Sequence, residues 1–255
     1  MAWLGKIVGG TMGFFLGGPL GLIAGVAFGN LFDSANKVER STIDSSSFSS
    51  VDQTQMVFFV GAFSMLAKMA TSDGSMVSSE RAKVEEFITQ DLRLAGPERQ
   101  AAIKVFNASL TSSGTFEQFA LQFYQNFAHE RTILELLMDV LVRVAAADGA
   151  ISSQEKVLLD NAAHIFRIPE SLLASIINRY SSVSASPSKA YSVLNLTPSA
   201  TDEEVKKAYR KLSIEFHPDT IASKGLPEEF TRFATEKFRA ISDAYEAIKK
   251  ERGLK

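Results

Sequence analysis

Residues 201–219 read TDEEVKKAYRKLSIEFHPD and decide how the C-terminal part of the chain folds. Their apolar side chains recur with the spacing of one helical face: Val205, Tyr209, Leu212 and Phe216. Thr201 followed by Glu204 is typical of a capping box at a helix start. Pro218 ends this helix, because proline disfavours helical geometry in the residue before it. The stretch therefore predicts one amphipathic helix followed by a turn.

The tripeptide His217-Pro218-Asp219 occupies that turn and leads to a second predicted helix. The second helix has its own apolar stripe: Phe230, Phe233, Phe238, Ile241, Tyr245 and Ile248. The outward face of the first helix is basic: Lys206, Lys207, Arg210 and Lys211. A short helix around Tyr191 and Leu194 can lie across the pair, and about 65 residues suffice for such a domain. We predict a small helical domain built on an antiparallel hairpin.

These features resemble the J-domain, the DnaJ module. The resemblance covers about residues 189–250 and rests on Tyr191-x-x-Leu194-x-Leu196, the basic helix, His217-Pro218-Asp219 and Phe238-Arg239-x-Ile241-x-x-Ala244-Tyr245. Asn195 departs from it, because the family usually has glycine there, but a left-handed backbone tolerates asparagine.

The resemblance implies a co-chaperone that docks its basic helix on an acidic face of an Hsp70 of the DnaK type and stimulates ATP hydrolysis there. A basic helix steers association with an acidic partner. Pro218 restricts the turn, which limits the entropy lost when His217 and Asp219 engage that partner.

The composition excludes several other classes of protein. The chain has 255 residues, a formal net charge of −2 and no cysteine, so neither a disulfide framework nor a thiolate metal site is possible. This charge balance does not indicate nucleic-acid binding. The three histidines, His129, His164 and His217, are too few to favour a His-rich zinc site. The sequence shows neither a phosphate loop nor a nucleophile with a paired base. We expect no enzyme activity and no cofactor.

The first 32 residues predict a transmembrane segment. No charged residue lies between Lys6 and Asp33, and the run from residue 7 to 32 can cross a bilayer core of roughly 30 Å as a helix. Glycine recurs every four residues: Gly9, Gly13, Gly17, Gly21 and Gly25. Such a ladder lets a second helix approach closely, so we predict self-association through this segment. Pro19 is expected to kink the span.

A flexible glycine-rich tail is the competing interpretation, but linkers are rich in serine and polar residues. Residues 33–50 are such a linker. Lys37 and Arg40 weakly favour a cytoplasmic location for the C-terminal bulk. We therefore expect a single-pass protein of the bacterial inner membrane.

The middle of the chain, residues 51–182, contains an internal duplication. A shift of 75 residues aligns Met65–Gly74 with Val140–Gly149 and continues through Glu80 and Glu155. We expect about seven helices and no strands, which makes the whole chain all-α. The repeated Asp-Gly-x5-Glu pattern resembles a TerB-like domain. Residues 183–188 are a predicted hinge, so the J-domain, residues 189–255, could reorient.

The order of these segments resembles the DjlA family of membrane-anchored DnaJ-like proteins of bacteria. The duplicated acids leave metal binding open as an alternative, because Asp73, Glu80, Asp148 and Glu155 could converge on a hard cation. Helix dipoles and Asp-Gly turns explain the same residues without a metal. A metal-responsive sensor and a membrane scaffold are therefore the competing hypotheses to the co-chaperone.

Overall fold

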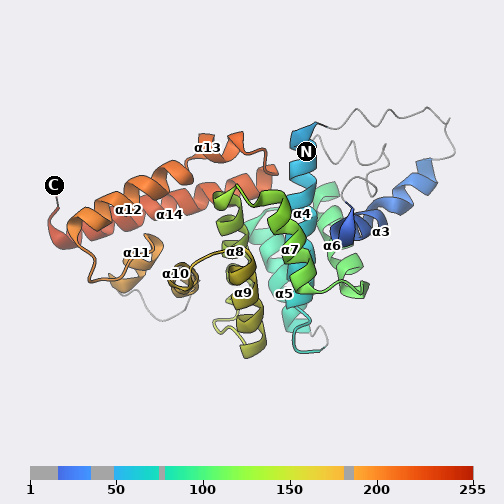
Figure 1. The fold of residues 1–255 in the computed structure, drawn as a ribbon, viewed down its shortest axis with the longest axis horizontal. Coiled ribbons are helices and arrows are strands. Elements are labelled where there is room, and N and C mark those ends of the chain that lie inside the picture. The colour runs from blue at the N-terminus through green and yellow to red at the C-terminus, as the bar shows by residue number, and fades with distance from the viewer. Residues whose placement is uncertain (1–16, 36–48, 75–77, 181–186, 255) are drawn as a thin grey trace. The chain divides into compact units, whose positions relative to one another are not determined.

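Every element that the computed structural model defines is helical (Figure 1). The structure describes residues 17–35, 49–74, 78–180 and 187–254. The helices of its first half are α3 (Gly18–Ala35), α4 (Ser50–Met69), α5 (Ser78–Glu86), the π-helix η2 (Phe87–Asp91), α6 (Gly96–Thr111) and α7 (Phe116–Phe127). Those of its second half are α8 (Arg131–Ala145), α9 (Ser153–Ile165), α10 (Glu170–Tyr180), α11 (Pro187–Val193), α12 (Asp202–Glu215), α13 (Pro218–Ser223) and α14 (Glu228–Arg252). The predicted all-α fold is confirmed.

The chain forms two compact units. The first contains residues 1–129 and residues 225–229, and the second contains residues 130–224 and 230–255. The second unit therefore combines α8, α9 and α10 with the helices of the predicted J-domain. Tertiary contacts thus divide the chain before α8, whereas composition and the hinge suggested a division near residue 183.

The first unit is built around α4, which packs against α3, α6 and α7. Phe58 on α4 contacts Phe123 and Phe127 of α7, with ring centroids 5.6 and 6.3 Å apart. Gly61 permits this approach, because a Cβ there would lie 2.6 Å from the ring of Phe123. Helix α4 is apolar on nearly all sides, and the surrounding helices bury it on nearly all sides.

The N-terminal glycine-rich stretch differs in part from the predicted single helix. Gly17 and Gly18 both have φ of +54°, and α3 begins at Gly18. Pro19 thus lies in the first turn of α3, where proline is tolerated, and does not kink the middle of a helix. Leu20 and Phe28 are buried among those residues of α3 that pack on α4, α6 and α7. Within the part of the chain described, no helix combines the length and apolar character needed to cross a bilayer.

The predicted duplication is visible in two helix-turn-helix units, α4–α5 and α8–α9. The amide of Gly74 donates to Thr71 and that of Gly149 to Ala146, each at 3.0 Å. Both glycines have positive φ, +109° and +92°. Helix α9 begins with a capping box of Ser152 and Glu155. In the first copy the corresponding residues 75–77 lie outside the described part.

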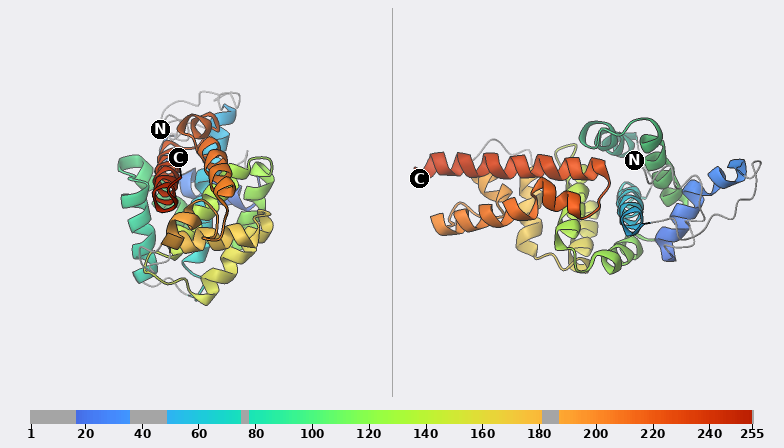
Figure 2. Two further views of the ribbon diagram at one scale, coloured as in Figure 1. Left: turned by 90° about the vertical axis from the view of Figure 1, so that its left-hand side faces the viewer. Right: turned by 90° about the horizontal axis from the view of Figure 1, so that it is seen from above.

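The second unit contains the predicted hairpin, α12 and α14, which lie side by side in both figures (Figures 1 and 2). Its core contains residues from the expected stripes: Tyr191, Leu194, Val205, Leu212, Phe216, Phe230, Ile241 and Ile248. Tyr209 stacks on Tyr245 at a ring distance of 4.0 Å. At the C-terminal end of α14, Arg252 donates hydrogen bonds to the Tyr191 hydroxyl and to the carbonyls of Pro198 and Ala200.

Candidate functional site

The His217-Pro218-Asp219 turn starts a short helix. His217 is the N-cap of α13, and Pro218 stands at the first helical position, where its missing N–H costs nothing. The His217 Nδ1 accepts a hydrogen bond of 3.2 Å from the amide of Asp219. The same nitrogen lies 3.7 Å from Oδ2 of Asp219. The turn is therefore held by local bonds, as a fixed rather than a flexible loop.

The same turn exposes the groups that a partner would contact. The Asp219 side chain is 95% exposed and that of His217 is 49% exposed. The His217 ring packs edge-on against Phe238 of α14, with centroids 5.6 Å apart. One edge of the imidazole is thus supported by the hairpin, and Asp219 projects into solvent.

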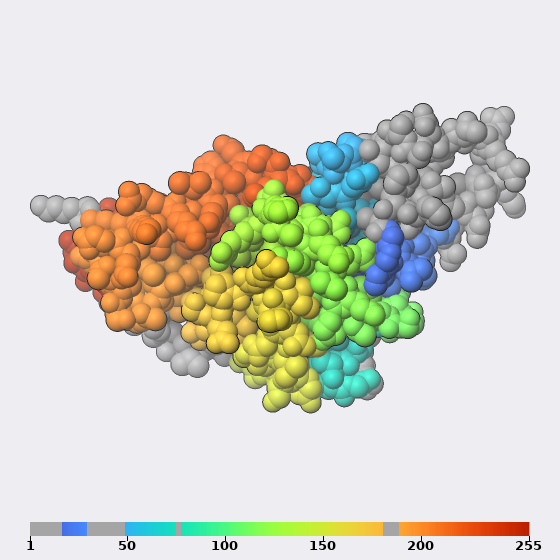
Figure 3. Space-filling view, in the orientation of Figure 1, coloured from blue at the N-terminus to red at the C-terminus, as the bar shows by residue number. Residues whose placement is uncertain are grey.

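The basic face predicted on α12 is present beside this turn. Lys207, Arg210 and Lys211 are exposed and Lys206 is half-buried, and the side chains of α12 form part of the orange surface in Figure 3. Lys211 is 3.9 Å from Glu215, a carboxyl whose pKa is raised by burial. Lys207 and Arg210 are therefore the strongest candidates for electrostatic contact with another protein.

A buried group of charged residues lies behind the turn. Asp139 of α8 is fully buried; its two oxygens accept from Nη1 of Arg179 at 3.1 Å each, and Nζ of Lys237 is 3.1 Å from Oδ2. Nζ of Lys237 also lies 4.0 Å above the ring of Phe216, the residue before His217. We call Asp139, Arg179 and Lys237 the buried charge cluster.

The pKa values in this cluster follow from burial and from the neighbouring charges. Burial alone would raise the pKa of Asp139, but the charges of Arg179 and Lys237, with hydrogen bonds from Lys237 and Tyr180, outweigh it and the pKa is lowered. Burial lowers the pKa of Lys237, and Asp139 opposes that shift. The negative charge of Asp139 thus stabilises the buried charge cluster.

Comparisons with known proteins identify the parts of the chain by their sequence. Family models match three segments: the co-chaperone DjlA transmembrane domain at residues 1–43, the tellurite resistance protein TerB at 60–177, and the DnaJ domain at 189–253. The co-chaperone protein DjlA of Photobacterium profundum is 30% identical over 98% of this chain and 99% of its own length. The chain belongs to the DjlA co-chaperone family. The co-chaperone protein DjlA of Coxiella burnetii (29% identical) and that of Escherichia coli (24%) each match over the full length of both chains. No solved structure matches.

Membership in the DjlA family identifies a J-domain co-chaperone and a membrane-anchored protein. Its relatives carry the name of co-chaperones. The sequence-based assignment of the family, of the TerB-like middle and of the J-domain is confirmed.

Three of the four duplicated carboxylates of this DjlA family member are engaged in local contacts. Asp148 accepts from the amide of Ala150, Glu155 completes the capping box, and Glu80 is 2.9 Å from Lys83. Among the described residues, no group of three or more acids or histidines could hold a metal ion. Asp73 is exposed. These contacts fit the helix-dipole and turn explanation of the acids.

Three glycines of the predicted ladder lie within the described residues, Gly17, Gly21 and Gly25; Gly9 and Gly13 lie outside them. Gly17 precedes α3, so it does not share a helical face with the other two. A Cβ added at Gly25 or at Gly29 would meet no atom within 4 Å. Leu22 and Val26 beside them are 73% and 67% exposed. We call Leu22, Gly25, Val26 and Gly29 the open strip of α3.

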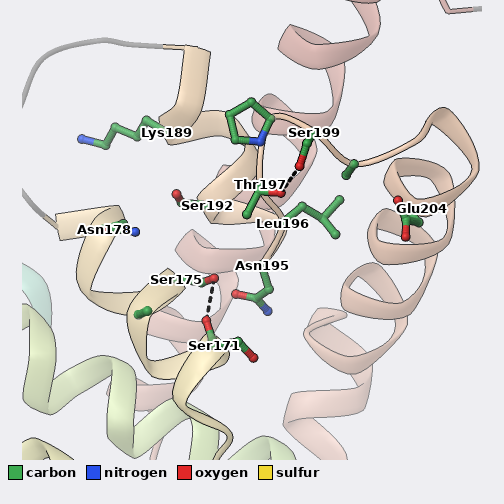
Figure 4. A pocket seen from close by; sticks show the side chains of 13 residues that line it. Ser171, Ser175, Asn178, Lys189, Ser192, Asn195, Leu196, Thr197, Ser199 and Glu204 are labelled. Carbon is green, nitrogen blue, oxygen red and sulfur yellow. Dashed lines mark hydrogen bonds between the residues drawn. The ribbon is translucent and has the colours of Figure 1, made fainter.

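A hollow of the second unit lies beside α10 and α11 (Figure 4). It has a volume of about 870 Å³ and is lined mainly by hydroxyl and amide side chains. Several of these are already paired: the Ser175 hydroxyl donates to the Ser171 carbonyl, and the Thr197 and Ser199 hydroxyls share a bond. None of the predicted docking residues lines it.

The sequence reasoning missed the buried charge cluster. Asp139 interrupts the otherwise apolar run Leu136–Val142, which is a signal that a charge is buried there. Its partners could not have been found, since Arg179 is 40 residues away and Lys237 belongs to the J-domain.

Proposed function

We propose that this DjlA family member binds an Hsp70 of the DnaK type through its J-domain and stimulates ATP hydrolysis by that partner. The observation that carries the proposal is the fixed, exposed turn of His217, Pro218 and Asp219 beside the basic face of α12. A preorganised loop loses little entropy on binding, and an adjacent cationic face accelerates encounter with an acidic surface.

The basic residues and the turn residues of the proposed docking surface have different roles. Lys206, Lys207, Arg210 and Lys211 attract the acidic face of the partner. Pro218 fixes the turn, while Asp219 and the exposed edge of His217 make the contacts that alter the partner. The protein supplies no catalytic group itself, so the chemistry of ATP hydrolysis stays in the Hsp70.

We further propose that residues 1–32 anchor the protein in the bacterial inner membrane as one span with the C-terminal bulk in the cytoplasm. This orientation brings the J-domain into the compartment of DnaK-type Hsp70 proteins and ATP. The open strip of α3 offers a surface for self-association through close helix packing.

Substitution of His217 tests the proposed function. His217→Gln removes the imidazole and its contact with Phe238, so we expect stimulation of Hsp70 ATP hydrolysis to be abolished while the helical content by circular dichroism stays unchanged. The reason is that His217 lies at a helix N-cap outside the apolar core, where a substitution costs about 1 kcal/mol.

His164→Gln is the matched control, because His164 is exposed on α9 and distant in sequence from the turn. This variant should stimulate as the parent protein does. Full stimulation by His217→Gln would refute the co-chaperone mechanism proposed above.

A further inference from the structure

The buried charge cluster connects the TerB-like part of the chain to the J-domain. Asp139 lies on α8 and Arg179 on α10, both within the segment that matches TerB, whereas Lys237 lies on α14 of the J-domain. All three belong to one compact unit. The Arg179 and Lys237 side chains are each 8% exposed, and that of Asp139 is 1% exposed. The two parts are therefore in direct contact at this point.

The cluster reaches the docking turn through two consecutive residues of α14. Lys237 places its ammonium over the ring of Phe216, and Phe238 packs against the ring of His217. Phe216 and His217 are themselves consecutive and lie at the junction between α12 and α13. The position of Lys237 therefore bears directly on the residue that precedes the docking turn.

A second contact leads from the cluster to the start of the J-domain. Nη2 of Arg179 donates to the Oδ1 of Asn195 at 3.3 Å. Asn195 has a φ of +58°, the left-handed conformation that glycine adopts most easily. A glycine would keep this backbone but could not accept the bond from Arg179. The asparagine that departs from the J-domain pattern is thus used as a contact to α10.

Further contacts hold the same two parts together. Nζ of Lys224, at the end of α13, is 2.7 Å from Glu130, which precedes α8. The charges of Glu135 and Arg131 on α8 also act on the Glu215 carboxyl at the end of α12. Both ends of the Phe216–Lys224 segment are therefore close to the N-terminal half of α8.

We propose that Asp139, acting through Lys237, is a positioning residue for the His217-Pro218-Asp219 turn, so that the second TerB-like repeat determines how strongly the J-domain stimulates its partner. This inference rests on the proposed function and deepens it. The cationic face of α12 remains exposed, so the repeat supports the docking turn rather than covering the docking surface. A buried ion cluster suits this role, because removing one partner strands the other charges.

The test is a titration of the full chain, in detergent micelles, against a DnaK-type Hsp70, with ATP hydrolysis as the readout. Asp139→Asn and Asn195→Gly should each lower the maximal stimulation, by roughly three- to tenfold for the former and less for the latter. The concentration that gives half of the maximum should change little, because the basic face of α12 is untouched. Asp160→Asn, at the exposed ion pair with Lys156, is the matched control and should behave as the parent protein.

The maximal stimulation and the half-maximal concentration together distinguish a positioning role from simple loss of structure. A variant that is partly unfolded behaves as a lower concentration of active protein, so its curve moves to higher concentration and reaches the same maximum. That outcome for both variants would overturn the inference, as would unchanged stimulation by both. Asn195→Gly keeps the test decisive if Asp139→Asn does not fold, because it removes one bond and no buried charge.

A double-mutant cycle tests the route through Lys237. In the background of Lys237→Met, which keeps the apolar contact with Phe216, Asp139→Asn should cause little further loss of maximal stimulation. Additive losses would exclude Lys237 as the connection.

A readout without Hsp70 separates failure of this inference from failure of the proposed function. The chain has three histidines, so the ring signal of His217 can be assigned by its absence in His217→Gln. Asp139→Asn should shift that signal while those of His129 and His164 stay in place. If His217→Gln stimulates normally, the proposed function fails; if it does not stimulate but Asp139→Asn neither shifts the signal nor lowers the maximum, only the present inference fails.

Discussion

Two residues, Asn195 and Glu229, have contacts or surroundings that the neighbouring sequence does not explain. Asn195 stands where J-domains usually have glycine, and its backbone adopts the left-handed conformation that the pattern predicts. Its side chain bonds to Arg179, a partner that the sequence could not indicate. Glu229 is a second such residue: it is 3% exposed, and its carboxylate has no hydrogen-bond partner outside its own residue within the described part of the chain.

Glu229 predicts a pH dependence of stability. Burial, together with Glu98 and Glu228, raises its pKa from 4.5 to about 7. Between these values the folded protein holds a proton that the unfolded chain has released, so the stabilisation is complete below pH 4.5 and is lost as the pH rises through 7. Glu229→Gln should remove this slope and stabilise the protein at pH 8 by on the order of 3 kcal/mol.

Thermal unfolding of the full chain in detergent micelles from pH 5 to 8 measures the effect. Glu203→Gln is the control, because Glu203 is an exposed carboxylate on α12 that does not act on Glu229. Parallel curves for the parent protein and Glu229→Gln would contradict the assignment of the slope to Glu229.

At the scale of elements, α12 has two faces with different roles. Val205, Leu212 and Phe216 are buried against the rest of the hairpin, whereas Lys207 and Arg210 face solvent. A face that contributes nothing to the core can be changed without unfolding the helix, so its role in binding can be measured separately.

Reversal of the charges on α12 should weaken the proposed association with Hsp70. We expect Lys207→Glu with Arg210→Glu to reduce affinity on the order of tenfold at low salt, mainly through a slower association rate. Binding of the parent protein should also weaken from 50 to 500 mM salt, over which the Debye length falls about threefold. Surface plasmon resonance measures both effects.

Lys104→Glu with Lys250→Glu makes the same change of net charge at exposed positions outside α12. This control should leave the association rate nearly unchanged. Affinity of the parent protein that does not vary with salt would place the docking surface elsewhere.

At the scale of the whole molecule, the chain combines an anchor, a TerB-like part and a J-domain. Self-association through the anchor would bring more than one J-domain to the same place on the membrane. The structure refines which glycines can serve this purpose, because Gly25 and Gly29 have open space beside them, whereas Gly17 lies before the helix.

Leucine at these glycines should block close helix packing. Gly25→Leu with Gly29→Leu keeps the segment apolar, so we expect the protein to stay in the membrane fraction but to lose chemical crosslinking of dimers in membranes. Val26→Leu adds apolar volume beside the glycines without filling their groove, and its dimers should persist. Dimers that survive the double substitution would mean that the open strip of α3 is not the packing surface.

The sequence by itself determined the helical fold, the duplication and the J-domain turn, because each depends on local spacing. The periodicity of α12 and α14 and the capping box at Thr201 appear in the structure as the pattern predicts. The sequence could not determine whether the apolar residues of α3 contact lipid or protein, since both environments accept the same side chains. In the structure Leu20 and Phe28 pack against protein.

Only the tertiary structure decided what surrounds the docking turn. Asp139, Arg179 and Lys237 are far apart in the sequence, and only Asp139, within the apolar run Leu136–Val142, indicates a buried charge. A buried ion requires a partner brought to it by the fold, and no local rule names that partner. For this reason local spacing predicted the His217 turn, while its connection to the second TerB-like repeat emerged only from three-dimensional packing.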